Sequence, residues 1–104
     1  MKSKKYIVIY IIVLINFTVF AQYGKQKKAD NLFNKFSFVD ASEVYKDLIE
    51  NDFNKDYSVR QLADSYAYMR NPDSAVVYYK KAVEQNNVPI EYYYKYAQAL
   101  RGNK

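Results

Sequence analysis

Two hydrophobic patterns divide the chain at residue 21. Residues 6–21 form an apolar run, whereas from residue 22 onward apolar residues recur at intervals of three and four. Because an α-helix turns once every 3.6 residues, the second pattern gathers apolar side chains on one face and indicates amphipathic helices. Helices are predicted over 23–36, 39–51, 57–69, 72–85 and 89–101, so the predicted fold class is all-α.

The second pattern repeats itself with a period of 34 residues. Alanines stand at positions 29, 63 and 97 and again at 41 and 75, and tyrosines stand at 45 and 79. Leu62 and Tyr96 have the same spacing. Small residues let two helix backbones approach closely, so their recurrence at one period predicts similar helical hairpins that stack on one another.

One such hairpin is predicted within residues 57–85. On its first helix, Leu62 and Tyr66 lie four residues apart and therefore share a face. On its second helix, Ala75, Tyr79 and Ala82 share a face in the same way. The two apolar faces can pack antiparallel across a short turn.

Four of the predicted helices have a sequence signal at their start. Pro72 suits a first helical position because its missing N–H would be unpaired there, and Asn71 before it can cap the helix. Asp40, with a glutamate three residues later, resembles a capping box. Asp56 is a predicted cap for the next helix, and Pro89 is predicted to begin the last one.

A 34-residue helix–turn–helix period with these small and aromatic positions resembles the tetratricopeptide repeat (TPR). The resemblance implies a TPR-type helix–turn–helix solenoid over residues 22–104, with two full repeats plus the first helix of a third. The repeat-packing positions that it implies are Ala29, Ala41, Tyr45, Leu62, Ala63, Tyr66, Ala75, Tyr79, Ala82, Tyr96 and Ala97. The rival interpretation is an unrelated helical hairpin bundle, which predicts no common period.

The last predicted helix is unusually aromatic for the end of a stack. It carries Tyr92, Tyr93, Tyr94 and Tyr96. Helical repeats bury their apolar faces only against neighbours, so we expect a further partner for this helix. Either the chain is a piece of a longer protein, or this face is a binding or dimer surface.

Residues 1–21 have the layout of a secretory signal peptide. Lys2, Lys4 and Lys5 precede the apolar run, and the run ends in Val19-Phe20-Ala21. Small or modest side chains thus occupy the positions that a signal peptidase reads before a cut at Gln22. The rival interpretation is a retained membrane anchor. Spanning a bilayer takes about 20 apolar residues, more than the run provides, so the pattern favours cleavage.

Composition argues against most enzyme chemistry. Among its 104 residues the chain has no Cys, no His and no Trp, and its two glycines stand at 24 and 102. Thiolate or imidazole nucleophiles, Cys and His metal ligands and phosphate-cradling glycine loops are therefore excluded. We expect no catalytic residues, no cofactor and no metal. Asp52, Asn54 and Asp56 begin like a calcium loop, but Tyr57 and Ala63 occupy the positions that need glycine and an acid.

Charge indicates that nucleic acid is not the partner. The formal net charge is +5, with 16 Lys and Arg against 11 Asp and Glu. Three of the basic residues precede the apolar run, so the predicted domain itself is nearly neutral. A nucleic-acid-binding domain of this size is expected to be strongly basic along one face.

The repeat register places candidate binding residues on the predicted concave face. These are Arg60, Asp64, Tyr94, Gln98 and Arg101, whose donors, amide and phenol suit an extended peptide. The bland alternative is that Arg60 and Asp64, four residues apart, simply pair with each other. Some of the many tyrosines could instead serve as glycan-stacking platforms, namely Tyr68, Tyr78, Tyr92 and Tyr93.

A second, narrower resemblance concerns the order of segments. The signal sequence ending in Phe-Ala-Gln, the TPR start that follows it and the segment 91–100 (EYYYKYAQAL) are similar to the N-terminus of OmpA-like envelope proteins of Bacteroidota. That resemblance implies an exported, outer-membrane-associated periplasmic scaffold whose partners are other proteins, envelope or secretion components. It also implies a membrane association that runs only through the signal peptide or through further C-terminal domains. The alternative is a carbohydrate-binding or nutrient-uptake accessory module built on TPR helices.

Overall fold

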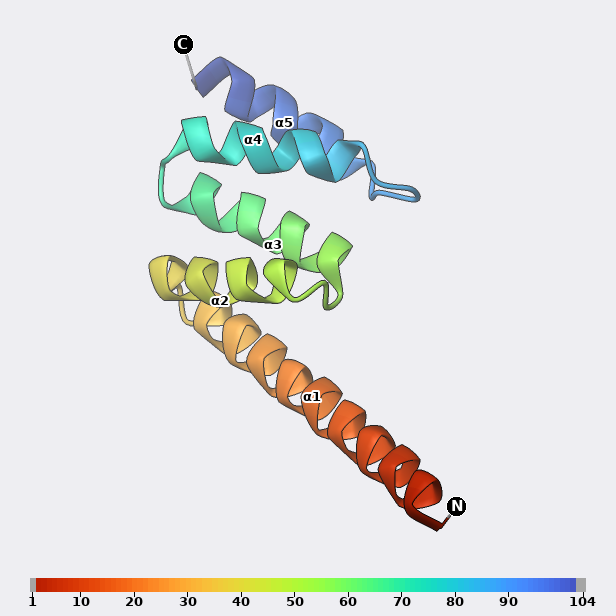
Figure 1. Cartoon of the computed structure of the whole chain (residues 1–104). Helices are drawn as coiled ribbons and strands as arrows, with labels where there is room; N and C mark the ends of the chain where they lie inside the picture. Colours follow the sequence, from red (N-terminus) through yellow and green to blue (C-terminus); the bar gives the residue numbers. More distant parts are fainter. Residues whose placement is uncertain (1, 103–104) are drawn as a thin grey trace.

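The computed structural model describes residues 2–102, and this part of the chain contains five α-helices and no β-strand. The predicted all-α class is therefore confirmed. The helices follow one another as a row of antiparallel neighbours, each packed on the next (Figure 1). Their bounds are α1 Lys2–Asn34, α2 Phe38–Glu50, α3 Lys55–Tyr68, α4 Pro72–Val83 and α5 Glu91–Gly102.

Helix α1 is longer than the sequence pattern predicts. The expected start at residue 23 is wrong, because the apolar run and the amphipathic segment form one uninterrupted helix. No proline lies in either segment, so nothing breaks the hydrogen-bond ladder between them. The N-terminal half of α1 extends away from the other helices as a long arm, and the molecule is 65 Å in its longest dimension (Figure 1).

The arm carries exposed apolar side chains on all sides, from Tyr6 to Phe20. Within the described residues, the segment Lys4–Asn34 is the one helix that is long and apolar enough to cross a membrane. A signal sequence near an N-terminus meets the same criteria of length and apolar composition. The arm is therefore compatible with a signal sequence.

The 34-residue step is visible in the backbone of the two hairpin turns. Phe36 and Arg70 both adopt the left-handed conformation, with φ of 64° and 57°. The amide of Phe36 donates to the carbonyl of Phe33 at 3.0 Å, and the amide of Arg70 donates to the carbonyl of Ala67 at the same distance. The α1–α2 and α3–α4 hairpins thus turn with one geometry.

The start of α4 confirms two predictions. Pro72 is its first residue, and Asn71 is its N-cap. The side-chain oxygen of Asn71 accepts a hydrogen bond from the amide of Ser74 at 3.2 Å. This bond satisfies one of the amide groups that a helix start leaves unpaired.

Three other predicted helix starts are wrong. The N-cap of α2 is Ser37, so Asp40 lies inside the helix. The N-cap of α3 is Asn54, so Asp56 lies in the first helical turn. There its negative charge interacts favourably with the positive end of the helix dipole. Helix α5 begins at Glu91, and Pro89 precedes it.

The core consists mainly of small and aromatic residues from successive helices. Nine residues assigned to repeat packing are buried: Ala29, Ala41, Tyr45, Leu62, Ala63, Tyr66, Ala75, Tyr79 and Ala82. Tyr96 is only half-buried and Ala97 is exposed. Their equivalents Leu62 and Ala63 lie on α3, which has a helix on each side, whereas α5 is the last helix of the row within the described residues and packs mainly on α4.

Candidate functional site

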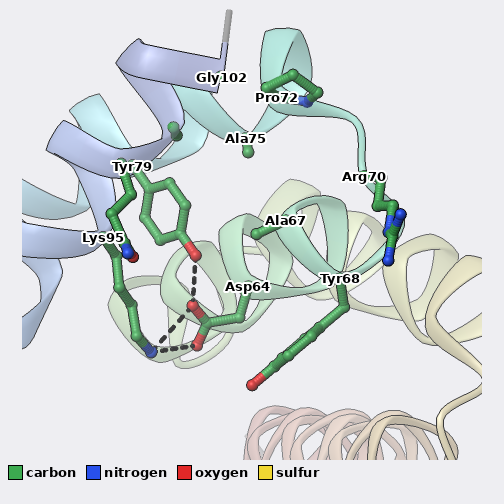
Figure 2. Close-up of a pocket in the computed structure, with 11 residues that line it drawn as sticks. Asp64, Ala67, Tyr68, Arg70, Pro72, Ala75, Tyr79, Lys95 and Gly102 are labelled. Atoms are coloured by element: carbon green, nitrogen blue, oxygen red, sulfur yellow. Dashed lines mark hydrogen bonds and ion pairs between the residues drawn. The ribbon is translucent and has the colours of Figure 1, made fainter.

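Asp64 of α3 joins three helices through a buried carboxylate. The hydroxyl of Tyr79 on α4 donates to Oδ1 at 2.7 Å, and the hydroxyl of Tyr92 on α5 donates to Oδ2 at 3.0 Å. Lys95 Nζ, also on α5, lies 3.2 Å from Oδ1 in an ion pair (Figure 2). Asp64 is only 6 % exposed, so its carboxylate has lost its hydrogen bonds to water. The three donors replace those bonds.

Asp30 of α1 forms an equivalent cluster 34 residues earlier. It accepts hydrogen bonds from Tyr45 on α2 and from Tyr57 on α3, the latter at 2.8 Å. Gln61, which is the equivalent of Lys95 at the 34-residue step, donates to the hydroxyl of Tyr45 at 3.3 Å. We call these groups the first Asp–Tyr cluster (Asp30, Tyr45 and Tyr57) and the second Asp–Tyr cluster (Asp64, Tyr79, Tyr92 and Lys95). Each one ties a hairpin to the helix that follows it.

The phenols of both clusters are held in the protonated form. Burial, followed by the hydrogen bond to Asp30, raises the pKa of Tyr57 to about 12. The same two causes raise the pKa of Tyr45 and, with Asp64 as acceptor, that of Tyr79. Burial and the charge of Asp64 raise the pKa of Tyr92. These hydroxyls remain donors at neutral pH, which suits a structural role rather than proton transfer.

A pocket of about 490 Å³ opens beside the second Asp–Tyr cluster, between α3, α4 and α5. Figure 2 shows Asp64 and Lys95 at one end and Arg70 at the other, with small residues between them. The lining residues are Asp64, Ala67, Tyr68, Arg70, Pro72, Ala75, Tyr79, Lys95, Gln98, Ala99 and Gly102. The arrangement is an apolar slot with a cation near each end, a form that suits a ligand with a compact apolar body.

The structure brings two of the five predicted groove residues, Asp64 and Gln98, to this pocket. Tyr94 is 62 % exposed, and its hydroxyl accepts a hydrogen bond from Gln98 at 3.2 Å. Arg101 is exposed on α5 and does not line the pocket. Arg60 lies elsewhere, because its guanidinium donates to Gln85 at 2.9 Å. The five residues therefore do not form one continuous site.

The alternative that Arg60 and Asp64 pair with each other is wrong. The acceptor for Arg60 is Gln85, and the cation beside Asp64 is Lys95. Lys95 lies 31 residues beyond Asp64, on the next helix of the stack but one. Lys95 and Arg70 line the pocket although neither was among the predicted site residues. The available signal for Lys95 was the 34-residue period, which places it one helical turn before the equivalent of Asp64.

The tyrosines proposed as glycan platforms differ in their surroundings. The ring of Tyr68 stacks on Phe38 with centroids 4.8 Å apart, and the ring of Tyr78 stacks on Tyr66 at 5.6 Å. Tyr92 is buried, whereas Tyr93 is half-exposed. Two of the four rings therefore already have one face covered by another ring of the same chain.

No protein-family model matches the chain, and neither a curated protein nor a solved structure is significantly similar to it. Function must therefore be argued from the geometry of the site. Within residues 2–102, no three His, Cys, Asp or Glu side chains lie close enough together to hold a metal ion. The features that remain are the repeated hairpins, the two Asp–Tyr clusters and the pocket.

Proposed function

We propose that this chain is a TPR-type domain that works as a non-catalytic scaffold for protein–protein interaction. The observation that carries the proposal is the pocket beside the second Asp–Tyr cluster, in a stack of hairpins that repeats every 34 residues. Stacked helical repeats offer extended surfaces on which other polypeptides lie. A pocket among such helices gives the bound polypeptide a point of specificity.

The Asp–Tyr clusters supply the rigidity that such a scaffold needs. Each of the two carboxylates accepts bonds from two neighbouring helices, so a hairpin cannot tilt against its neighbour without breaking charge-assisted hydrogen bonds. A preorganised surface loses little conformational entropy when a partner binds. The clusters therefore support affinity by holding the helices around the pocket in place.

We further propose that the domain is exported and works in the periplasm, associated with the outer membrane, as part of an OmpA-like protein. The apolar arm of α1 supports export because its length and composition match a signal sequence. The partners proposed on this basis are envelope or secretion components.

The test is affinity capture with the tagged full chain from detergent-solubilised, crosslinked cell envelopes. We expect envelope proteins to be recovered with the natural chain, and recovery to fall at least fivefold when Ala67 is replaced by Arg, because a long cation then fills the pocket. Val77→Arg is the matched control, since Val77 is half-exposed on α4 and lies outside the pocket. Equal recovery with both variants, or capture of polysaccharide alone, would contradict the scaffold and favour the glycan-binding alternative.

A further inference from the structure

The first hairpin shows what fills the space that becomes a pocket in the second. Between α1, α2 and α3, the rings of Phe33, Phe38 and Tyr68 pack together near the turn. The centroid of Phe33 lies 5.2 Å from that of Phe38 and 5.9 Å from that of Tyr68. Three aromatic side chains, one from each helix, thus occupy this end of the first hairpin.

One repeat later, all three rings are replaced by small residues. The equivalents of Phe33, Phe38 and Tyr68 at the 34-residue step are Ala67, Pro72 and Gly102. All three small residues line the pocket, and Figure 2 shows them around it. The turn itself keeps its geometry, as the φ angles of Phe36 and Arg70 show. The pocket therefore occupies the volume that aromatic rings fill in the preceding hairpin.

We propose that this pocket receives an aromatic side chain, of the Phe or Tyr class, from a partner polypeptide. The inference rests on the proposed scaffold function and names the side chain that the scaffold recognises. A planar ring matches the space because three rings of this chain already pack in the equivalent place. The slot offers Ala67, Ala75 and Ala99 as apolar walls against which a ring loses its contact with water.

The charges at the pocket further define the ligand. At the 34-residue step, Arg70 is the equivalent of Phe36, and Lys95 is the equivalent of Gln61. Within the described residues no carboxylate forms an ion pair with Arg70, whereas both oxygens of Asp64 already accept hydrogen bonds. The pocket therefore favours an aromatic residue that has a carboxylate next to it, either an acidic neighbour or a chain terminus.

The first experiment titrates a minimal probe, N-acetyl-L-phenylalanine, into the full chain in detergent micelles. Amide chemical shifts of Ala67, Ala99 and Gly102 report occupation of the pocket. We expect saturable shifts with a dissociation constant on the order of 1 mM, and binding at least fivefold weaker for N-acetyl-L-alanine, which lacks the ring. N-acetyl-L-phenylalaninamide, which lacks the carboxylate, is expected to bind about threefold more weakly.

The second experiment fills the pocket with the aromatic residues that the first hairpin has at the equivalent positions. Ala67→Phe restores the equivalent of Phe33, and Gly102→Tyr restores the equivalent of Tyr68. A Cβ atom on Gly102 would lie 3.5 Å from Cβ of Pro72, an ordinary contact, and Gly102 is exposed at the end of α5, so a side chain there leaves the backbone in place. Circular dichroism of both variants checks that they keep their helices. Each refilled variant is expected to lose at least tenfold in probe affinity, while the control Val77→Phe keeps it.

Absence of saturable shifts with the natural chain overturns the proposal, and so does unchanged probe binding in Gly102→Tyr. Saturation by an oligosaccharide such as maltohexaose, with none by the aromatic probe, also overturns it and assigns the pocket to a glycan. These outcomes are separate from the envelope capture. A scaffold whose pocket recognises a side chain without an aromatic ring would pass the capture, including the loss in Ala67→Arg, and fail the probe titration.

Discussion

Asp64 and Arg60 lie four residues apart on α3, a spacing that favours an ion pair between them. The pair does not form because the Asp64 side chain faces the core, where two phenols and Lys95 already occupy its oxygens. Arg60 lies above the ring of Tyr92, 6.0 Å from its centroid, and bonds to Gln85. Local spacing identified both residues as polar sites, but it could not rank partners that come from other helices.

Replacing Asp64 by alanine is expected to lower the free energy of unfolding by about 3 kcal/mol, because two buried phenols and one ammonium lose their acceptor. Asp30→Ala is expected to cost about 1–2 kcal/mol, since Asp30 is only half-buried and accepts from two phenols. Urea unfolding followed by circular dichroism measures both. The exposed Asp73 is the control, and Asp73→Ala should change stability by less than about 0.5 kcal/mol. Equal losses for Asp64 and Asp73 would show that the cluster carries no stability.

The same phenols predict a limit to stability at high pH. Tyrosine in an unfolded chain titrates near pH 10, whereas the pKa of Tyr57 is raised to about 12 and that of Tyr45 is also raised. Above pH 10 the unfolded chain therefore loses protons that the folded chain keeps. Stability is unaffected below pH 10 and falls as the pH rises from about 10 to 12.

This pH dependence is checked by recording tyrosinate absorbance and helical circular dichroism in one titration. We expect the exposed tyrosines to ionise first and the remaining absorbance to rise together with the loss of helix. Tyr94→Phe, which removes an exposed phenol, should leave the unfolding pH unchanged. Complete ionisation of all tyrosines near pH 10 with the helices intact would contradict the prediction.

At the scale of the element, periodicity predicts the amphipathic helices well. The observed bounds of α2, α3 and α4 agree with the predicted ones to within two residues. Pattern reasoning could not place the start of α1, because it separates an apolar run from an amphipathic segment even where the backbone is continuous. The caps at Asp40 and Asp56 were misplaced because several nearby polar residues can serve as a cap, and the observed caps Ser37 and Asn54 make no side-chain hydrogen bond that would distinguish them.

The left-handed turns between paired helices predict a stabilising change. Arg70 has a positive φ, which a residue with a Cβ adopts only at a cost, whereas glycine adopts it freely. Arg70→Gly is expected to raise the free energy of unfolding by about 0.5–1 kcal/mol. Urea unfolding is again the measurement. The control is Lys80→Gly in the last turn of α4, which should lower stability, by at most about 1 kcal/mol. A loss of stability in Arg70→Gly would show that the side chain contributes more than the backbone strain costs.

At the scale of the whole molecule, the stack of hairpins was predictable from the period, but the pocket was not. Its volume depends on the replacement of three rings on three helices, and the sequence gives no sign that Phe33, Phe38 and Tyr68 meet until the helices are packed. The burial of the Asp64 carboxylate likewise depends on the packing of α4 on α3 and on the contacts of Asp64 with α5. The helices that carry these residues were therefore predictable from the sequence, whereas the assembly of the residues into a pocket was not.

The apolar arm predicts that the chain is cut after Ala21 when it is expressed. We expect expression in a Gram-negative host to yield a chain that begins at Gln22, because Ala21 provides the small side chain that a signal peptidase requires. Intact mass spectrometry of the periplasmic fraction measures this. Ala21→Trp is expected to leave the precursor uncut, while Phe20→Leu keeps processing as the control. An uncut natural chain in the membrane fraction would show that the arm is a retained anchor.

The unbroken course of α1 has a mechanical consequence for the precursor. The helix has 33 residues and therefore measures about 50 Å. Its C-terminal half contacts the rest of the stack through the Lys25–Asp47 ion pair and through the edge-to-face contact of Tyr23 with Phe53. No hinge separates the apolar half from this C-terminal half. In a precursor whose apolar half is inserted in a bilayer, α1 would set the tilt of the helical stack toward the lipid, and cleavage after Ala21 would remove that constraint.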